Sequence, residues 1–469
     1  MGQGRSNQGQ VSQGSGILPW CVILTAVAVL VLSNYRAQQM MNLAYRSAVI
    51  LNWVSFGIAL LISPEIRKLL IKRDSLILVT SCMMLTVFAA VGWGDRAWLY
   101  TYISWKTIPL FYAGLLAAQR KVYQKCLLVG LIVSMAAVAA IDLTQMKVGG
   151  GSGVSREMMA NVVAQSTVRG NNFDAAESQI QHMIYHFPSL SLTAILAMGL
   201  LVEAKGLLRY LLVGSVLLFA TMVAVSTWTA AVLMLFAGFL LFTFMIVFRG
   251  RVSVRARLLI SGCVLVALGA IAGYIAGETG KSRFETGLMA DRLTGLTRLL
   301  SARVGISERL DELTGGRVAR FKTSIDSFLD SPFIGIGNDT YDPKVGGHSF
   351  WVDMLAQYGL VGVAPMFYWL WIVLRSAMLL IWNLRSDPTD RAFATVVFVY
   401  YLSLIGNPYF FVTMPISVFF LTAGIVSGRA ETMMLKLKYI QGAYRQKVFS
   451  DQHARHANMR RFDIKNDGE

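Results

Sequence analysis

His348 is the residue of this sequence best suited to acid–base chemistry. It follows Gly346 and Gly347 and precedes an apolar stretch that begins at Phe350, so we expect it at the start of a helix. The positive end of a helix dipole disfavours the imidazolium ion, and a neutral imidazole is a suitable general base. The glycines allow a substrate to approach the backbone closely. The alternative is that His348 caps the helix or hydrogen-bonds a loop carbonyl.

An amphipathic helix is predicted over residues 317–330, shortly before His348. Its apolar residues recur at helical spacing; they are Val318, Phe321, Ile325, Phe328 and Leu329. Arg317, Arg320 and Ser324 occupy the opposite face, and Pro332 ends the helix. The pattern therefore places two guanidinium groups on one helix face, a short distance along the chain from the histidine.

The composition of the whole chain is that of a membrane protein. Of its 469 residues, 55% are hydrophobic and only 15% are charged, whereas soluble domains carry about 25% charged residues. The net charge of +17 does not indicate nucleic-acid binding, because most basic residues flank apolar stretches. The four cysteines lie within or beside apolar segments and form no CxxC pair, which argues against a disulfide framework or a zinc site.

Apolar runs near the length needed to cross a bilayer, roughly 20 residues, recur along the chain. The predicted spans are 17–33, 47–62, 75–92, 102–118, 126–142, 189–204, 207–225, 229–248, 258–277, 361–382, 392–409 and 412–428. The fold class is therefore all-α: a polytopic integral membrane protein of about 12 transmembrane helices. The charged residues within spans are expected to be almost confined to Arg375.

Basic residues alternate between the two sets of connections. One set carries sixteen Lys and Arg and the C-terminal tail adds nine, whereas the alternate short connections carry seven, with Lys106 counted among them. By the positive-inside rule the first set and both termini are cytoplasmic. The two long connections, 143–188 and 278–360, are then extracytoplasmic loops with amphipathic helices, and long structured loops usually carry function.

This topology divides the chain into seven segments. In order they are a disordered cytoplasmic tail (1–16), spans one to five (17–142), an outer loop (143–188), spans six to nine (189–277), a large outer loop with the expected active site (278–360), spans ten to twelve (361–428) and a basic cytoplasmic tail (429–469).

A longer pattern surrounds His348. It consists of Gly-Gly-Arg at 315–317, the amphipathic helix, Ser-Pro-Phe-Ile-Gly-Ile-Gly at 331–337, Gly-His-Ser at 347–349 and Asp-Met-Leu-Ala-Gln-Tyr-Gly-Leu-Val-Gly at 353–362. Over residues 305–362 this order resembles the O-antigen polymerase and O-antigen ligase superfamily of bacterial membrane glycosyltransferases. In that family a histidine of the last large outer loop is followed by a glycine eleven positions later, here Gly359. Ser349 stands where members commonly have Asn, which leaves the subgroup open.

The resemblance implies a reaction and roles for particular residues. A glycan would pass from an undecaprenyl-diphosphate donor to a sugar hydroxyl at the outer leaflet of the bacterial inner membrane, with no metal and no cofactor. His348 would take the hydroxyl proton, and Arg317 would stabilise charge on the diphosphate leaving group. The candidate substrate-binding residues are Arg309, Arg320, Gly347, Asp353 and, in the first outer loop, Arg169.

Each of these roles has an alternative. An ion pair with Asp311, Glu312 or Asp326 is the alternative for the three arginines of the second loop. Asp353 is expected to interact with the helix N-terminus rather than to act as an acid. His182 and His186 have the i, i+4 spacing of a metal pair, but no third ligand is apparent and an interfacial amphipathic helix is favoured.

The partners and rival functions follow from the same reasoning. The expected partners are an undecaprenyl-diphosphate-linked oligosaccharide, membrane lipid and either a polysaccharide chain-length regulator or a flippase, without nucleic acid. A polymerase of O-antigen, capsule or exopolysaccharide is favoured over an O-antigen ligase that delivers glycan to the lipid A core. The further alternatives are a multispan transporter or lipid flippase, disfavoured because the two halves of the chain do not resemble each other, and a membrane scaffold.

Overall fold

The computed structural model describes most of the helical part of the chain. The described residues are 17–33, 35–93, 95–148, 173–225, 229–249, 317–337, 345–346, 349–383, 386–406 and 413–466, with scattered positions between 253 and 269. Within them every regular element is a helix. The expected all-helical class is therefore confirmed for the part of the chain that the structure describes.

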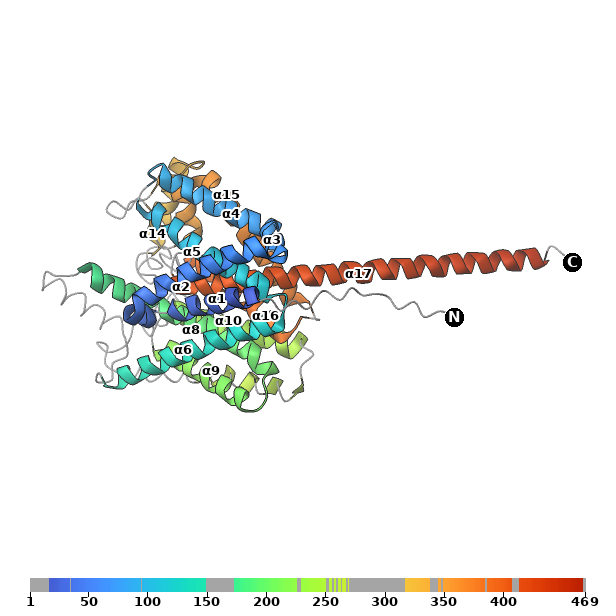
Figure 1. The fold of residues 1–469 in the computed structure, drawn as a ribbon, viewed down its shortest axis with the longest axis horizontal. Helices are drawn as coiled ribbons and strands as arrows, with labels where there is room; N and C mark the ends of the chain where they lie inside the picture. The colour runs from blue at the N-terminus through green and yellow to red at the C-terminus, as the bar shows by residue number, and fades with distance from the viewer. Residues whose placement is uncertain are drawn as a thin grey trace, which may run out of the picture.

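The helices form one bundle, from which the last helix extends far beyond the rest (Figure 1). Their bounds are α1 Ile17–Leu32, α2 Tyr35–Ile62, α3 Pro64–Leu70, α4 Arg73–Ala90, α5 Asp95–Ala117, α6 Lys121–Val148, α8 Phe173–Glu203, α9 Leu207–Val225, α10 Thr229–Arg249, α14 Arg317–Asp330, α15 Phe350–Trp382, α16 Pro388–Gly406 and α17 Thr413–Asn466. Helix α14 lies at the end of the bundle opposite to the end from which α17 leaves (Figure 1).

Eight helices among the described residues are long and apolar enough to cross a membrane. They contain Leu43–Ile62, Arg73–Ala90, Lys121–Ile141, His186–Glu203, Leu207–Ala224, Ala230–Val247, Phe350–Trp382 and Met414–Gln441. Helix α1 is a shorter apolar helix, and the predicted spans 102–118 and 392–409 are helical in α5 and α16. Most of the predicted span 258–277 lies outside the described residues, so the total of twelve stays a prediction.

The surface of the bundle is apolar where a soluble protein would be polar. Large hydrophobic side chains such as Leu43, Leu61 and Val133 are exposed, while hydroxyls such as those of Ser191 and Thr193 are buried. The buried Ser191 connects α8 to α10, because its Oγ donates a hydrogen bond to the carbonyl of Ala231 at 2.8 Å. An apolar exterior is stable when lipid covers it, and the protein is therefore a multi-pass membrane protein.

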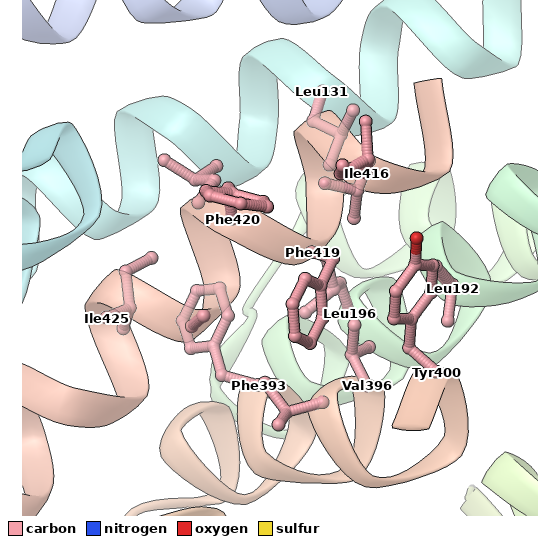
Figure 2. Packing of buried hydrophobic residues seen from close by; sticks show 14 of the residues in the cluster. Leu131, Leu192, Leu196, Phe393, Val396, Tyr400, Ile416, Phe419, Phe420 and Ile425 are labelled. Carbon is pink, nitrogen blue, oxygen red and sulfur yellow. The ribbon is translucent and has the colours of Figure 1, made fainter. Parts of the chain in front are cut away.

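Helix α8 lies at the centre of this bundle. It packs against α9, α10, α16 and α17, and its apolar stretch His186–Glu203 is almost entirely enclosed. Figure 2 shows Leu192 and Leu196 facing the side chains of α16 and α17. The Tyr400 and Phe419 rings stack there with centroids 4.5 Å apart. Aromatic and branched side chains thus fill the space between helices that are far apart in the chain.

The end of the bundle from which α17 leaves is joined by charged side chains. Arg429 of α17 pairs with Asp390 at 2.7 Å and with Asp387 at 3.4 Å, and Lys121 of α6 pairs with Asp387 at 2.7 Å. Arg391 is buried and donates hydrogen bonds to the carbonyls of Met245 and Asn383. These pairs connect α6, α10, α15, α16 and α17 around the start of α16.

Two helices extend beyond the predicted ends of their spans. Helix α8 begins at Phe173, so residues 173–188 of the expected outer loop are a continuous extension of the following span. Helix α17 continues through Gly428 to Asn466, so residues 429–466 of the expected cytoplasmic tail are helical. The tail sequence is rich in strong helix formers such as Ala, Leu, Met, Lys and Arg and contains no proline, which permits the helix to continue.

The expectation that charge within the spans is almost confined to Arg375 is wrong. Lys106, which the charge count placed in a connection, lies inside α5 with only 7% of its surface exposed. Its Nζ lies 5.9 Å from the centre of the Tyr45 ring and 5.2 Å from that of Tyr102. Cation–π contacts of this kind stabilise a desolvated ammonium group, which the count of basic residues could not reveal.

Candidate functional site

Helix α14 packs against α15 through its small polar residues. Ser324 is fully buried and Ser327 nearly so, whereas Ile325 and Leu329 of the apolar stripe are exposed. The predicted bounds 317–330 are confirmed. The sequence pattern did not reveal which side faces the protein, because a serine becomes a buried contact only when it finds hydrogen-bond partners.

Ser324 has such partners on both sides. Its hydroxyl donates to Asp353 Oδ1 at 2.6 Å and accepts from the backbone N–H of Gly346 at 2.9 Å. Asp353 Oδ2 in turn accepts from the N–H of Ser349 at 2.8 Å. We call these four residues the serine–aspartate clamp. Because the clamp includes the backbone N–H groups of Gly346 and Ser349, it fixes the chain on both sides of positions 347 and 348.

The start of α15 is a helix N-terminus, as the sequence predicts for the position after His348. Ser349 is the N-cap residue, with extended backbone angles, and Asp353 lies in the first turn. A carboxylate near a helix N-terminus is stabilised by the helix dipole. Each carboxylate oxygen of Asp353 accepts one hydrogen bond, from Ser324 and from Ser349. These two bonds fix the position of the aspartate side chain.

Helix α15 is interrupted at Gly359, and residues 332–337, which follow α14, supply hydrogen-bond partners to the backbone groups at the interruption. Gly359 has φ 62° and ψ −177°, a conformation essentially restricted to glycine. The carbonyls of Ala356 and Gln357 accept from Ile336 and Gly337, while the N–H groups of Leu360 and Val361 donate to Pro332 and Phe333. Residues 332–337 thus replace two helical hydrogen bonds that the break removes, and every one of these backbone groups stays paired.

The glycines of this pattern permit the two backbones to touch. A side chain at Gly359 would lie 2.3 Å from the carbonyl carbon of Phe333, and one at Gly335 would lie 2.4 Å from the carbonyl oxygen of Gln357. The same oxygen accepts from Trp93 Nε1 at 2.7 Å. The glycine eleven positions after the histidine therefore has a packing function, which is to let α15 bend around residues 332–337.

Aromatic side chains fix the inner side of the bend. The Tyr358 ring is fully buried and meets Phe88 edge to face with centroids 5.4 Å apart. Its hydroxyl accepts from Gln357 Nε2 at 3.1 Å, and the Tyr100 ring lies 6.4 Å away. The bend is therefore held by α4 and α5 as well as by the segment that follows α14.

The predicted site residues fall into three groups. His348, Gly347, Arg309 and Arg169 lie outside the described residues. Arg317 is the first residue of α14, seven positions and hence two turns before Ser324, and nothing is described of its side chain. Arg320 has an exposed side chain, and its carbonyl oxygen would lie 2.1 Å from a side chain at Gly346. The structure thus brings the backbone of Arg320 into contact with the residue two positions before His348.

Sequence reasoning placed Ser324 on the correct helix but gave it no function. The helical pattern placed Ser324 on the face of Arg317 and Arg320, but nothing in the sequence indicated that its hydroxyl has partners outside the helix. Its importance arises from contacts with Gly346 and Asp353, which are 22 and 29 residues away in the chain.

The structure describes no metal site. Among the described residues no group of three or more His, Cys, Asp and Glu side chains is placed to hold a metal ion. His186 is buried in α8 with its ring 5.7 Å from that of Phe187, and nothing is described of the side chain of His182. His186 thus packs within the bundle.

The family of this segment is known from comparison. Residues 213–367 match the family described as O-antigen ligase. The segment, about a third of the chain, is similar to that family, and we call it the O-antigen ligase domain because of this similarity. It begins in α9, includes α10 and α14, and ends in α15 after the bend at Gly359. The resemblance to the O-antigen polymerase and ligase superfamily is thereby confirmed, and the family implies an activity of the glycosyltransferase type.

The O-antigen ligase domain contains most of the predicted site. Positions 309, 317, 320, 347, 348 and 353 lie within it, and Arg169 lies outside. No curated protein matches the sequence. The domain also contains the serine–aspartate clamp and the bend at Gly359, so both lie in the segment that is similar to the O-antigen ligase family.

Proposed function

We propose that this protein is a polysaccharide polymerase that transfers a glycan from an undecaprenyl-diphosphate donor to a sugar hydroxyl at the outer leaflet of the inner membrane. The observation that carries the proposal is the serine–aspartate clamp within the O-antigen ligase domain. It holds Gly346, two residues before His348, and Ser349, the residue after it, and a base with a defined position requires a fixed backbone of this kind.

In the proposed step a hydroxyl oxygen of the acceptor sugar attacks the anomeric carbon of the donor glycan. His348 takes the hydroxyl proton as the new glycosidic bond forms, and the bond from the anomeric carbon to the phosphate oxygen breaks. The diphosphate of the carrier leaves with the electron pair of that bond. Arg317 binds its oxygens and stabilises the charge, a contribution that is worth about 3–4 kcal/mol when one such donor is removed.

The other predicted residues have supporting functions in this proposal. Arg309 and Arg320 bind diphosphate or glycan, Gly347 permits close approach of the sugar, and Arg169 contributes from the earlier outer loop. Asp353 acts through the clamp, and it also contacts substrate at the edge of the clamp. The reaction uses no metal and no cofactor, because the diphosphate bond of the donor supplies the free energy. A chain-length regulator or a flippase is the proposed protein partner.

The test uses His348→Ala and Arg317→Ala in the full chain, with a lipid-linked repeat unit as the substrate. Both variants are expected to lose polymer formation while inserting into the membrane at wild-type levels. Arg73→Ala is the matched control, because its side chain is 67% exposed and it begins α4 next to Lys72, which pairs with Glu431 of α17. Polymer of wild-type length and yield from both variants contradicts the assignment of the site.

A ligase is the second candidate, because the matching family is described as O-antigen ligase. Polymerase and ligase differ in the acceptor and share the proposed chemistry. Incubating the wild-type protein with the lipid-linked repeat unit alone distinguishes them, since a polymerase yields a ladder on the carrier. A ligase leaves the repeat unit unchanged until lipid A core is added and then transfers glycan to that core.

A further inference from the structure

Helix α14 leaves a set of apolar side chains uncovered. Val318, Ile325 and Leu329 of the helix, together with Phe333 and Ile334 directly after it, expose between 38% and 67% of their surface. Positions 318, 325 and 329 are seven and four residues apart, so they lie on one narrow arc of the helix. We call these five residues the apolar strip.

The surroundings of the apolar strip divide the helix into three sectors. Ser324 and Ser327 form the sector that is buried against α15. Lys322, Asp326 and Asp330 form an exposed polar sector on the other side. The strip lies between the two. A helix with one packed side, one apolar side and one charged side fits a boundary between protein, lipid and water.

The apolar strip continues into a transmembrane helix. Leu360 and Val361 of α15 are about half exposed, and their N–H groups donate to the carbonyls of Pro332 and Phe333. The backbone of the strip is therefore within hydrogen-bond distance of the exposed side of α15. Farther along the same helix, within the candidate span Phe350–Trp382, Tyr368 and Trp371 are also exposed.

We propose that the apolar strip is immersed in the bilayer and contacts the acyl chains of membrane phospholipids. Lys322, beside the strip, then reaches the phosphate groups at the surface, as long basic side chains do at membrane boundaries. The packed side of α14 carries the serine–aspartate clamp, so the clamp lies within about one helix diameter, roughly 10 Å, of the acyl chains. The proposal concerns the placement of α14 and does not depend on glycan transfer.

Spin labels test the placement in the full chain. The cysteines Cys21, Cys82, Cys126 and Cys263 are first replaced, and a nitroxide is attached at Leu329→Cys, at Leu360→Cys as a lipid-facing reference, or at Asp326→Cys as the matched control. The protein is placed in nanodiscs of phosphatidylethanolamine and phosphatidylglycerol. The label at 329 is expected to show the high oxygen access and the loss of nickel-chelate access seen at 360, whereas the label at 326 is open to the nickel chelate.

A second measurement keeps the native cysteines. Benzoylphenylalanine at position 333 is expected to cross-link to phospholipid acyl chains on illumination, and the same group at position 330 is not. Nickel access at 329 equal to that at 326 overturns the proposal. Exclusion of both oxygen and nickel at 329, or cross-links from 333 to protein alone, also overturns it, because either result means that protein covers the apolar strip.

Discussion

At the end of the bundle that carries α14, segments are joined mainly by hydrogen bonds to backbone groups, with Asp353 as the charged partner. At the opposite end, α6, α16 and α17 are joined by ion pairs among Lys121, Asp387, Asp390 and Arg429. Backbone hydrogen bonds fix the path of the chain, whereas ion pairs fix the positions of whole helices. The first kind of contact suits a site, and the second suits a scaffold.

The two ends of the bundle tolerate different kinds of substitution. The α14 end depends on close approach of two backbones, which any added side chain disturbs. The charged end depends on the balance of charge around Arg429, whose loss leaves two carboxylates without their common partner. Substitutions at the two ends should therefore separate effects on activity from effects on assembly.

The largest effect is expected from Gly359→Ala. An alanine there combines an unfavourable positive φ with contact at 2.3 Å to the backbone of Phe333, so we expect a loss of about 3–6 kcal/mol in the free energy of unfolding. Gly92→Ala is the matched control, because Gly92 has φ 78° with nothing within 4 Å of the added atom. It should lose only about 1–2 kcal/mol. Denaturant unfolding in detergent measures both, and equal losses would contradict the proposed close approach.

A smaller but still large effect is expected from Arg429→Met. The substitution removes the partner of Asp390, a side chain that is only 5% exposed, and breaking such a buried pair costs about 3–5 kcal/mol. The yield of folded protein should fall, while the activity per folded molecule should stay at the wild-type level. Lys72→Met is the control, since the Lys72–Glu431 pair is far more open to solvent than Asp390, with side chains 30% and 45% exposed, and a pair of this kind is worth about 1 kcal/mol. A variant with normal stability and lost activity would place Arg429 in the site and remove the distinction between the ends.

The smallest expected change in stability comes from Ser324→Ala, and here activity is the informative measurement. The variant leaves the Gly346 N–H without its acceptor, which costs about 1–3 kcal/mol. If the clamp positions His348, kcat should fall by about one to two orders of magnitude with little change in KM. Thr323→Ala, at an exposed neighbouring residue that bonds only within its own helix in this structure, should keep wild-type kcat. A change in KM alone would mean that Ser324 contacts substrate instead of positioning the base.

Much of the fold could be predicted because lipid imposes a simple rule on sequence. Long apolar runs must be helices, and α4, α9, α10 and α15 lie where such runs predict them. The bounds of α14 followed from helical spacing and from Pro332. The error at Lys106 has the same origin, because counting basic residues assigns each one to a connection and cannot detect a lysine enclosed by Tyr45 and Tyr102.

The candidate site could be predicted in its parts but not in its connections. The order of glycines, His348 and Asp353 in the chain was enough to indicate the family, which the match over residues 213–367 confirms. The catalytic functions of His348 and Arg317 stay predictions. The sequence did not indicate that Ser324 and Asp353 bind the chain on either side of the histidine, because those contacts join residues 22 and 29 positions apart.

The sequence alone determined that this is a helical membrane protein with its unusual polar pattern between residues 305 and 362, since hydropathy and residue order are local properties. Only the tertiary structure decided that α14 turns its serines toward α15 and leaves Ile325 and Leu329 exposed. It also decided that residues 332–337 complete the bend at Gly359. The physical reason is that the partner of a buried hydrogen-bonding group can lie far away in the sequence. An amphipathic pattern also does not indicate which side of the helix contacts protein and which contacts lipid.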